Sequence, residues 1–93
     1  MTTPICHCAA AGVSWVVQTN GVLVTDEFSR QSSLLEYPDA AAWELLMRGH
    51  PPAVAASMFR WIMNIEEEEA QTRIVQYIRQ WTDAGWICPE NFD

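Results

Sequence analysis

The chain has 93 residues, enough for one small domain with a single core and too few for a catalytic cleft between two lobes. Its net charge is −7, from 12 Asp and Glu against 5 Arg, with no Lys. An acidic surface repels phosphate backbones, and the lack of Lys excludes Schiff-base catalysis and a P-loop. We therefore predict neither an enzyme nor a nucleic-acid partner.

The beginning of the chain carries no recognisable pattern. Residues 1–12 show no periodicity, and we expect a flexible tail followed by one domain over residues 13–93. Cys6-His7-Cys8 could join Cys88 in a thiolate-rich metal site, but C-x-C spacing leaves little room for two ligands, and a disordered tail is favoured. We predict no metal and no cofactor.

The location of the protein is predicted from three negative features. The first residues lack the basic and apolar regions of a signal peptide, and no apolar run approaches the roughly 18 residues of a membrane span. Three Cys are an odd number for a secreted disulfide framework. We expect a cytoplasmic protein without a membrane partner.

The first regular pattern is that of a β-hairpin. Asn20-Gly21 is a strong two-residue turn signal, and placing it at the two central turn positions pairs Val17 with Val24. A polar turn then leads into a third short strand from Gln31 to Glu36. This register gathers on one face the residues that we assign to the core: Trp15, Val17, Val22 and Val24.

From Pro38 onward the apolar residues follow helical spacing. The first helix is expected to stop at Gly49, and Pro51-Pro52 suits the first turn of a second helix that ends near Asn64. The predicted core stripe of the second helix is Val54, Ala55, Met58, Trp61 and Ile62.

The third helix has the clearest amphipathic pattern. Asn64 is its expected N-cap with Glu67 at N3, and the run of Glu residues complements the helix dipole before Gly85 ends the helix. Its apolar stripe is Ala70, Ile74, Tyr77, Ile78 and Trp81. Three strands followed by three helices favour an α+β fold of winged-helix type, with a three-stranded antiparallel sheet.

Several of these segments together resemble the PqqD-like family, also called the RiPP recognition element. The resemblance covers about residues 13–88 and rests on Gly21-Val22-Leu23-Val24, Ser33-Leu34-Leu35, Ala40-Ala41-Ala42-Trp43-Glu44-Leu45-Leu46, Ile74-Val75-Gln76-Tyr77-Ile78 and Ala84-Gly85-Trp86-Ile87. It implies a small winged-helix-like domain that is a peptide chaperone without catalytic residues. Such a domain binds the leader of a ribosomally synthesised precursor peptide and presents it to a modifying enzyme, often a radical S-adenosylmethionine enzyme.

The resemblance also implies where the leader binds: as an added strand on the edge of the third strand, beside the third helix. An exposed sheet edge offers unpaired N–H and C=O groups to an extended peptide, and an unoccupied edge could also pair with that of a second copy to give a homodimer. The candidate edge is Ser32, Ser33, Leu34, Leu35 and Glu36. The candidate helix wall is Arg73, Gln76, Tyr77 and Gln80, with Tyr77 at the boundary of the core stripe.

Two other functions remain open from sequence alone. A scaffold or regulatory subunit that binds another protein would use the same kind of edge. A winged-helix DNA-binding regulator is disfavoured because its third helix would offer only Arg73 and Arg79 behind a run of Glu. That run, Glu66-Glu67-Glu68-Glu69, is either a solvated helix start or a surface that steers a basic partner.

Overall fold

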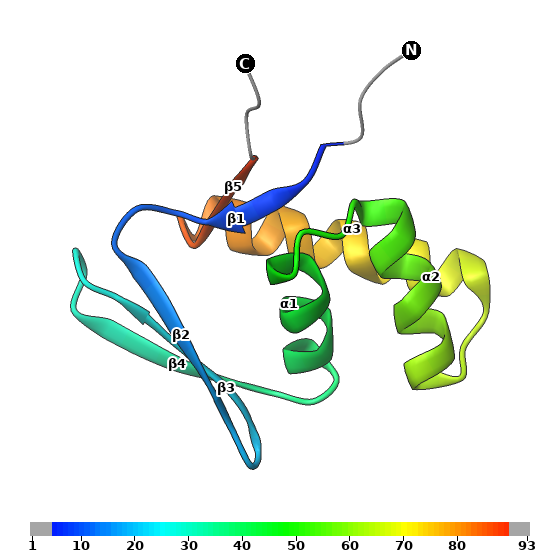
Figure 1. Ribbon diagram of the computed structural model, residues 1–93, viewed down its shortest axis with the longest axis horizontal. Helices are drawn as coiled ribbons and strands as arrows, with labels where there is room; N and C mark the ends of the chain where they lie inside the picture. Colours follow the sequence, from blue (N-terminus) through cyan, green and yellow to red (C-terminus); the bar gives the residue numbers. More distant parts are fainter. Residues whose placement is uncertain (1–4, 90–93) are drawn as a thin grey trace.

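The computed structural model describes residues 5–89, so the first residues of the predicted tail and the last of the predicted domain lie outside the described part of the chain. The strands of that part are β1 (His7–Ala9), β2 (Val13–Gln18), β3 (Gly21–Asp26), β4 (Gln31–Glu36) and β5 (Ile87–Pro89). Its helices are α1 (Asp39–Met47), α2 (Pro52–Met63) and α3 (Glu67–Asp83). The three-stranded sheet has the order β2-β3-β4, and all its pairings are antiparallel (Figure 1).

The hairpin between β2 and β3 has a different register from the predicted one. Gln18 pairs with Gly21, so Thr19 and Asn20 occupy the turn, and Val17 lies opposite Val22 instead of Val24. The prediction was wrong because Gly21 is the first residue of β3 and not a turn residue. It packs against β4, where a Cβ would clash with the carbonyl oxygen of Leu35. The shift moves the pairing by two residues, so each side chain keeps its predicted face.

The core lies between one face of this sheet and the helices. Val22, Val24 and Leu35 are buried on the inner face, whereas Val17 is 53% exposed because the hairpin tip extends beyond α1 (Figure 1). Val17 is therefore not the core residue that the pattern predicts.

Trp43 of α1 occupies the centre of an aromatic cluster. Its ring centroid lies 6.4 Å from that of Trp15, 5.2 Å from that of Trp81 and 6.3 Å from that of Trp86, each in edge-to-face geometry. Such pairs stabilise a core beyond the area they bury. Trp81 is 1% exposed, so the prediction that it is a core residue is confirmed.

The second helix buries a different side from the one predicted, and the two sides share only Ala55. Its buried residues are Ala55, Ala56 and Phe59. Of the predicted stripe, Ala55 is buried, whereas these members are exposed: Val54, Met58, Trp61 and Ile62. The segment is apolar nearly all round, so its own pattern does not define which side packs; the neighbouring α3, which supplies Tyr77 to the Phe59 ring, does.

The boundary between α2 and α3 also differs from the prediction. Asn64 ends α2 in the left-handed conformation (φ 55°), and Glu66 occupies the N-cap position of α3. Asn tolerates this conformation better than most residues, and it allows the Ile65 N–H to donate to the Arg60 carbonyl. Asn64 is thus a C-terminal residue of one helix and not the N-cap of the next.

The predicted flexible tail contains a strand. His7–Ala9 forms β1, which pairs antiparallel with β5 and lies beside it in Figure 1. Cys8 is the register partner of Cys88, and the Ala10 N–H donates to the Trp86 carbonyl at 2.9 Å. The expectation of a loose segment was wrong here, because the pairing strand lies at the other end of the chain and local periodicity cannot reveal it.

Candidate peptide-binding edge

The strand β4 is an edge of the three-stranded sheet. Within residues 5–89 it pairs with β3 on one side and with no other strand. It contains no Pro, so none of its residues lacks a main-chain donor. The candidate edge predicted from sequence, Ser32 to Glu36, coincides with this strand except for Gln31 at its start.

The main-chain groups on the free side of β4 can be identified from one contact. The Leu35 carbonyl oxygen lies against Gly21, so Leu35 directs its main-chain groups toward β3. The register is continuous along β4, and the N–H and C=O of alternate residues point to opposite sides of a strand. Ser32, Leu34 and Glu36 therefore direct their N–H and C=O groups away from the sheet.

The side chains of β4 divide between the two faces of the sheet. Leu35 is buried and Ser33 half-buried on the inner face. Leu34 is exposed on the outer face, where it lies opposite Leu23, which in turn lies opposite Val16. A peptide paired with β4 would find the inner-face residues on one side and this apolar row on the other.

Tyr77 connects α3 to the end of β4. Its hydroxyl donates a 2.7 Å hydrogen bond to Oδ1 of Asp39, the first residue of α1, three residues after Glu36. Its ring stacks on Trp81 with centroids 5.1 Å apart. Burial, together with the hydrogen bond to Asp39, raises the pKa of Tyr77 from 10.0 to about 12. Tyr77 is mainly a core residue, with its polar tip at the β4–α1 junction.

The other predicted residues of the helix wall lie to one side of Tyr77. Arg73 stacks its guanidinium over the Phe59 ring, 5.8 Å from its centroid, and is half-buried. Gln76 and Gln80 are exposed, one turn apart on α3. The helix therefore brings all four predicted wall residues to adjacent positions on its surface, and whether they contact a peptide stays a prediction.

Sequence reasoning missed Asp39 as a partner in this region. The signal was a carboxylate at the start of the first helix, which a dipole argument explains without any partner. Tyr77 at the edge of an apolar stripe was the complementary sign, because a buried Tyr hydroxyl needs a hydrogen-bond acceptor.

The cysteine-rich segment brings two thiols together but gathers no set of metal ligands among residues 5–89. Cys8 and Cys88 bring their Sγ atoms to 3.7 Å, but His7 alternates to the other face of β1 and is buried there. Over residues 5–89 the structure gathers no group of three or more His, Cys, Asp or Glu side chains that could hold a metal ion. In the same part of the chain, every helix is too short or too polar to cross a membrane.

Comparisons with known proteins place the fold. Neither a protein-family model nor a curated protein sequence matches the chain. A solved structure of lasso peptide synthetase B1 complexed with the leader peptide superposes with a TM-score of 0.80 at 20% identity, covering 89% of this chain and 98% of the other. TbiB1 in complex with the TbiA(beta) leader peptide superposes with a TM-score of 0.79 at 12% identity, covering 92% and 98%. At these identities the likeness concerns the fold, and it confirms the predicted winged-helix-like α+β architecture.

Proposed function

We propose that the protein is a non-catalytic peptide chaperone that captures the leader of a ribosomally synthesised precursor peptide and presents it to a modifying enzyme. The observation that carries the proposal is the free edge of β4, with its outward main-chain groups, in a fold shared with two proteins solved with leader peptides. The absence of a metal-ligand cluster within residues 5–89 and the lack of Lys agree with a binding role but do not carry it.

The binding mechanism follows from the chemistry of the edge. An extended leader would pair with the main-chain groups of Ser32, Leu34 and Glu36 as a fourth strand. Hydrogen bonds of this kind depend little on sequence, so specificity would come from side-chain contacts beside the strand. On the inner side these contacts would come from the α3 wall that ends at Tyr77, which the hydrogen bond to Asp39 holds near the end of β4.

The test uses one position and two substitutions. Ser32→Ala keeps the outward-facing N–H that Ser32→Pro removes, and it loses only the exposed 3.1 Å hydrogen bond between the Ser32 and Thr25 hydroxyls. Tagged wild-type protein and both variants are recovered from lysates of the source organism, and mass spectrometry identifies the bound material. We expect a short peptide with wild type and Ser32→Ala, and its loss with Ser32→Pro.

Ser33→Pro provides a second comparison, because Ser33 directs its N–H toward β3, as Leu35 does. This substitution should weaken the sheet itself, which thermal unfolding would detect. Peptide retention by a folded Ser32→Pro variant would remove β4 from the binding site. Recovery of a large protein alone, with all variants, would favour the scaffold function.

A further inference from the structure

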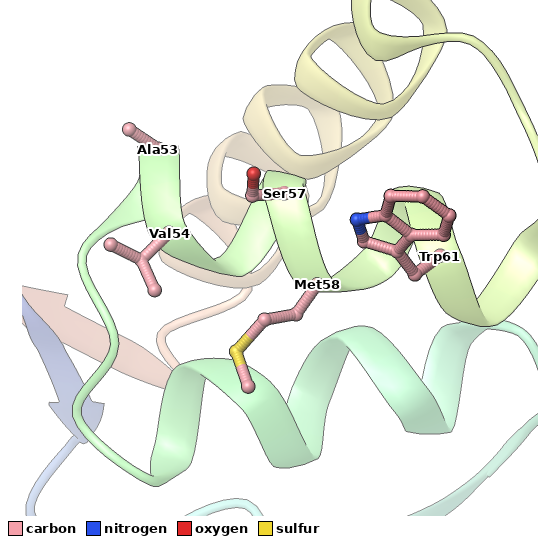
Figure 2. Close-up of a pocket in the computed structure, with 5 residues that line it drawn as sticks. All are labelled: Ala53, Val54, Ser57, Met58 and Trp61. Carbon is pink, nitrogen blue, oxygen red and sulfur yellow. The ribbon is translucent and has the colours of Figure 1, made fainter.

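The helix α2 exposes an apolar surface that the fold leaves uncovered. Val54, Met58, Trp61 and Ile62 recur along one side of the helix, and Trp61 is 78% exposed. Figure 2 shows Val54, Met58 and Trp61 projecting from α2 around a hollow of about 450 Å³, which Ala53 and Ser57 also line. We call the exposed residues of the helix, Val54, Met58, Trp61 and Ile62, the α2 face.

The composition of α2 indicates that both of its sides are suited to burial against other groups. One side buries Ala55, Ala56 and Phe59 in the core, and the α2 face is equally apolar. A helix that is apolar all round is normally buried on all sides, whereas a surface helix alternates apolar with polar residues. Contiguous exposed apolar residues of this kind mark interaction sites.

The α2 face lies apart from the proposed leader site. The helix packs on α1 and α3, and Figure 1 shows it at the end of the molecule away from the three-stranded sheet and its β4 edge. An occupant of the α2 face could therefore bind while a peptide occupies β4.

Charge beside the α2 face selects the kind of occupant. The α3 carboxylates begin four residues after Met63, and Glu67, Glu68 and Glu69 are all exposed. A second hollow between α2 and α3 is lined by Ala53, which it shares with the first, and by Gln71 and Val75. Glu68 lies one turn before Gln71 and two turns before Val75, so it is on the side of α3 that lines this hollow.

A second copy of the chain is a poor occupant of the α2 face. Each copy carries a charge of −7, and pairing two such faces would bring two sets of α3 carboxylates together. A different protein, with apolar side chains flanked by Lys or Arg, would fill the hollow beside Trp61 and neutralise Glu67 to Glu69. The Arg60 guanidinium lies over the Trp61 ring, 5.5 Å from its centroid, and an exposed Trp is a typical anchor residue of protein interfaces.

We infer that the α2 face is the docking surface for the modifying enzyme, through an apolar segment of that enzyme bordered by basic residues. The inference rests on the proposed function, since the enzyme is the partner to which the peptide is presented. It assigns the two partners to separate parts of the chain: the peptide to β4 and the enzyme to α2.

The experiment is site-specific photo-crosslinking in the source organism, followed by binding measurements on the purified partner. A benzophenone amino acid replaces Trp61 in one variant and Phe28 in a control; Phe28 is 81% exposed on the turn between β3 and β4. We expect position 61, and not position 28, to crosslink a peptide-modifying enzyme at an apolar segment flanked by Lys or Arg.

Affinity for the purified enzyme then tests the apolar contact and the charge attraction separately. Trp61→Ala should weaken binding by about tenfold or more, and Phe28→Ala should leave it unchanged. Glu68→Lys should weaken binding and reduce its dependence on salt. All three substituted residues are exposed, so circular dichroism should show a folded protein for each variant.

Each other outcome overturns the inference: a crosslink to a second copy, no crosslink at position 61, or enzyme affinity that Trp61→Ala does not alter. Failure of the proposed function is recognised separately. Trp61→Ala should still carry the co-purified peptide, and Ser32→Pro should still bind the enzyme. Peptide retention by Ser32→Pro would contradict the peptide site, while enzyme binding unaffected by Trp61→Ala would contradict the enzyme site.

Discussion

The Tyr77 hydroxyl donates a 2.7 Å hydrogen bond to Oδ1 of Asp39, joining the middle of α3 to the first residue of α1. Asp39 follows the end of β4 by three residues, so this bond ties the candidate helix wall to the segment that follows the candidate edge. The stacking of Tyr77 on Trp81 and its edge-to-face contact with Phe59 fix the ring from the core side. Tyr77 therefore links the candidate helix wall both to the core and to the start of α1.

Replacing Tyr77 by Phe tests the contribution of this hydrogen bond. The ring contacts remain, but a part-buried Asp39 carboxylate loses its donor, so we expect the free energy of unfolding to fall by about 1–2 kcal/mol. Urea denaturation measures the change. The matched control is Tyr37→Phe, which removes an exposed 3.2 Å hydrogen bond to Glu44 and should change stability less. Equal losses in the two variants would contradict a special role for the Tyr77–Asp39 pair.

The raised pKa of Tyr77 predicts a loss of stability in alkali. The unfolded chain releases the Tyr77 proton near the ordinary pKa of 10.0, whereas the folded chain holds it to about 12. The contribution of Tyr77 to stability is therefore complete below pH 10 and decreases as the pH rises from 10 toward 12. Denaturation of wild type and Tyr77→Phe between pH 9 and 12 should show their difference shrinking over this window. A constant difference would show that the hydroxyl titrates alike in both states.

How far the sequence predicts the fold depends on whether the deciding contact is local. The third helix has a polar and an apolar side, so its buried residues Ile74 and Trp81 follow from its own pattern. The second helix lacks that contrast, and only its packing against α3 decides that Phe59 faces inward and Trp61 outward. The predicted register of the hairpin was wrong for a related reason. Gly21 is required because a side chain there would clash with Leu35, which lies on another strand.

In the candidate site, too, some features follow from the local sequence and others depend on tertiary contacts. The β4 edge follows from a short strand without Pro between a polar turn and a helix, and its bounds are nearly those predicted. Which of its residues face outward depends on the register with β3, which sequence cannot supply. The exposure of the α2 face, including Trp61, is similarly a property of tertiary packing, because an apolar residue is expected inside until a structure shows otherwise.

His7 predicts a second pH effect, in mild acid. Its side chain is buried on β1, and its Nδ1 has no hydrogen-bond partner within residues 5–89. Burial lowers the pKa of His7 below 6.5, so the unfolded chain takes up this proton at a higher pH than the folded chain. The contribution of neutral His7 to stability is therefore fully present above pH 6.5, and it is lost as the pH falls through the folded-state pKa of His7.

Denaturation between pH 7.5 and 5 measures this effect, with His7→Leu as the comparison. Leu fills a buried apolar position without a proton to bind, so the variant should lose less stability over this interval than wild type. Because β1 pairs with β5, the protection factors of the Cys8 and Cys88 amides, taken relative to intrinsic exchange at each pH, should decrease in wild type as the pH falls. Identical pH profiles in the two proteins would mean that His7 is protonated equally in the folded and unfolded chain.

Cys8 and Cys88 predict a response to oxidation. They face each other across the β1–β5 ladder with Sγ atoms 3.7 Å apart, and register partners of an antiparallel pair have the Cα separation of a disulfide. Diamide would take one proton and one electron from each thiol, leaving an S–S bond and the reduced hydrazine. We expect the titratable thiols of the denatured chain to fall from the 3 Cys of the sequence to one.

The new bond would close a loop of about 80 residues, for which the chain-entropy argument gives a stabilisation of about 4.5 kcal/mol, less any strain. Thermal unfolding with and without dithiothreitol measures it. Cys6→Ser should retain the effect and Cys88→Ser should lose it, because Cys88 supplies one of the two sulfurs that the ladder holds together. A mixed population that includes Cys6 bridges, or covalent dimers in place of the internal bond, would show that the β1–β5 register does not select this pair.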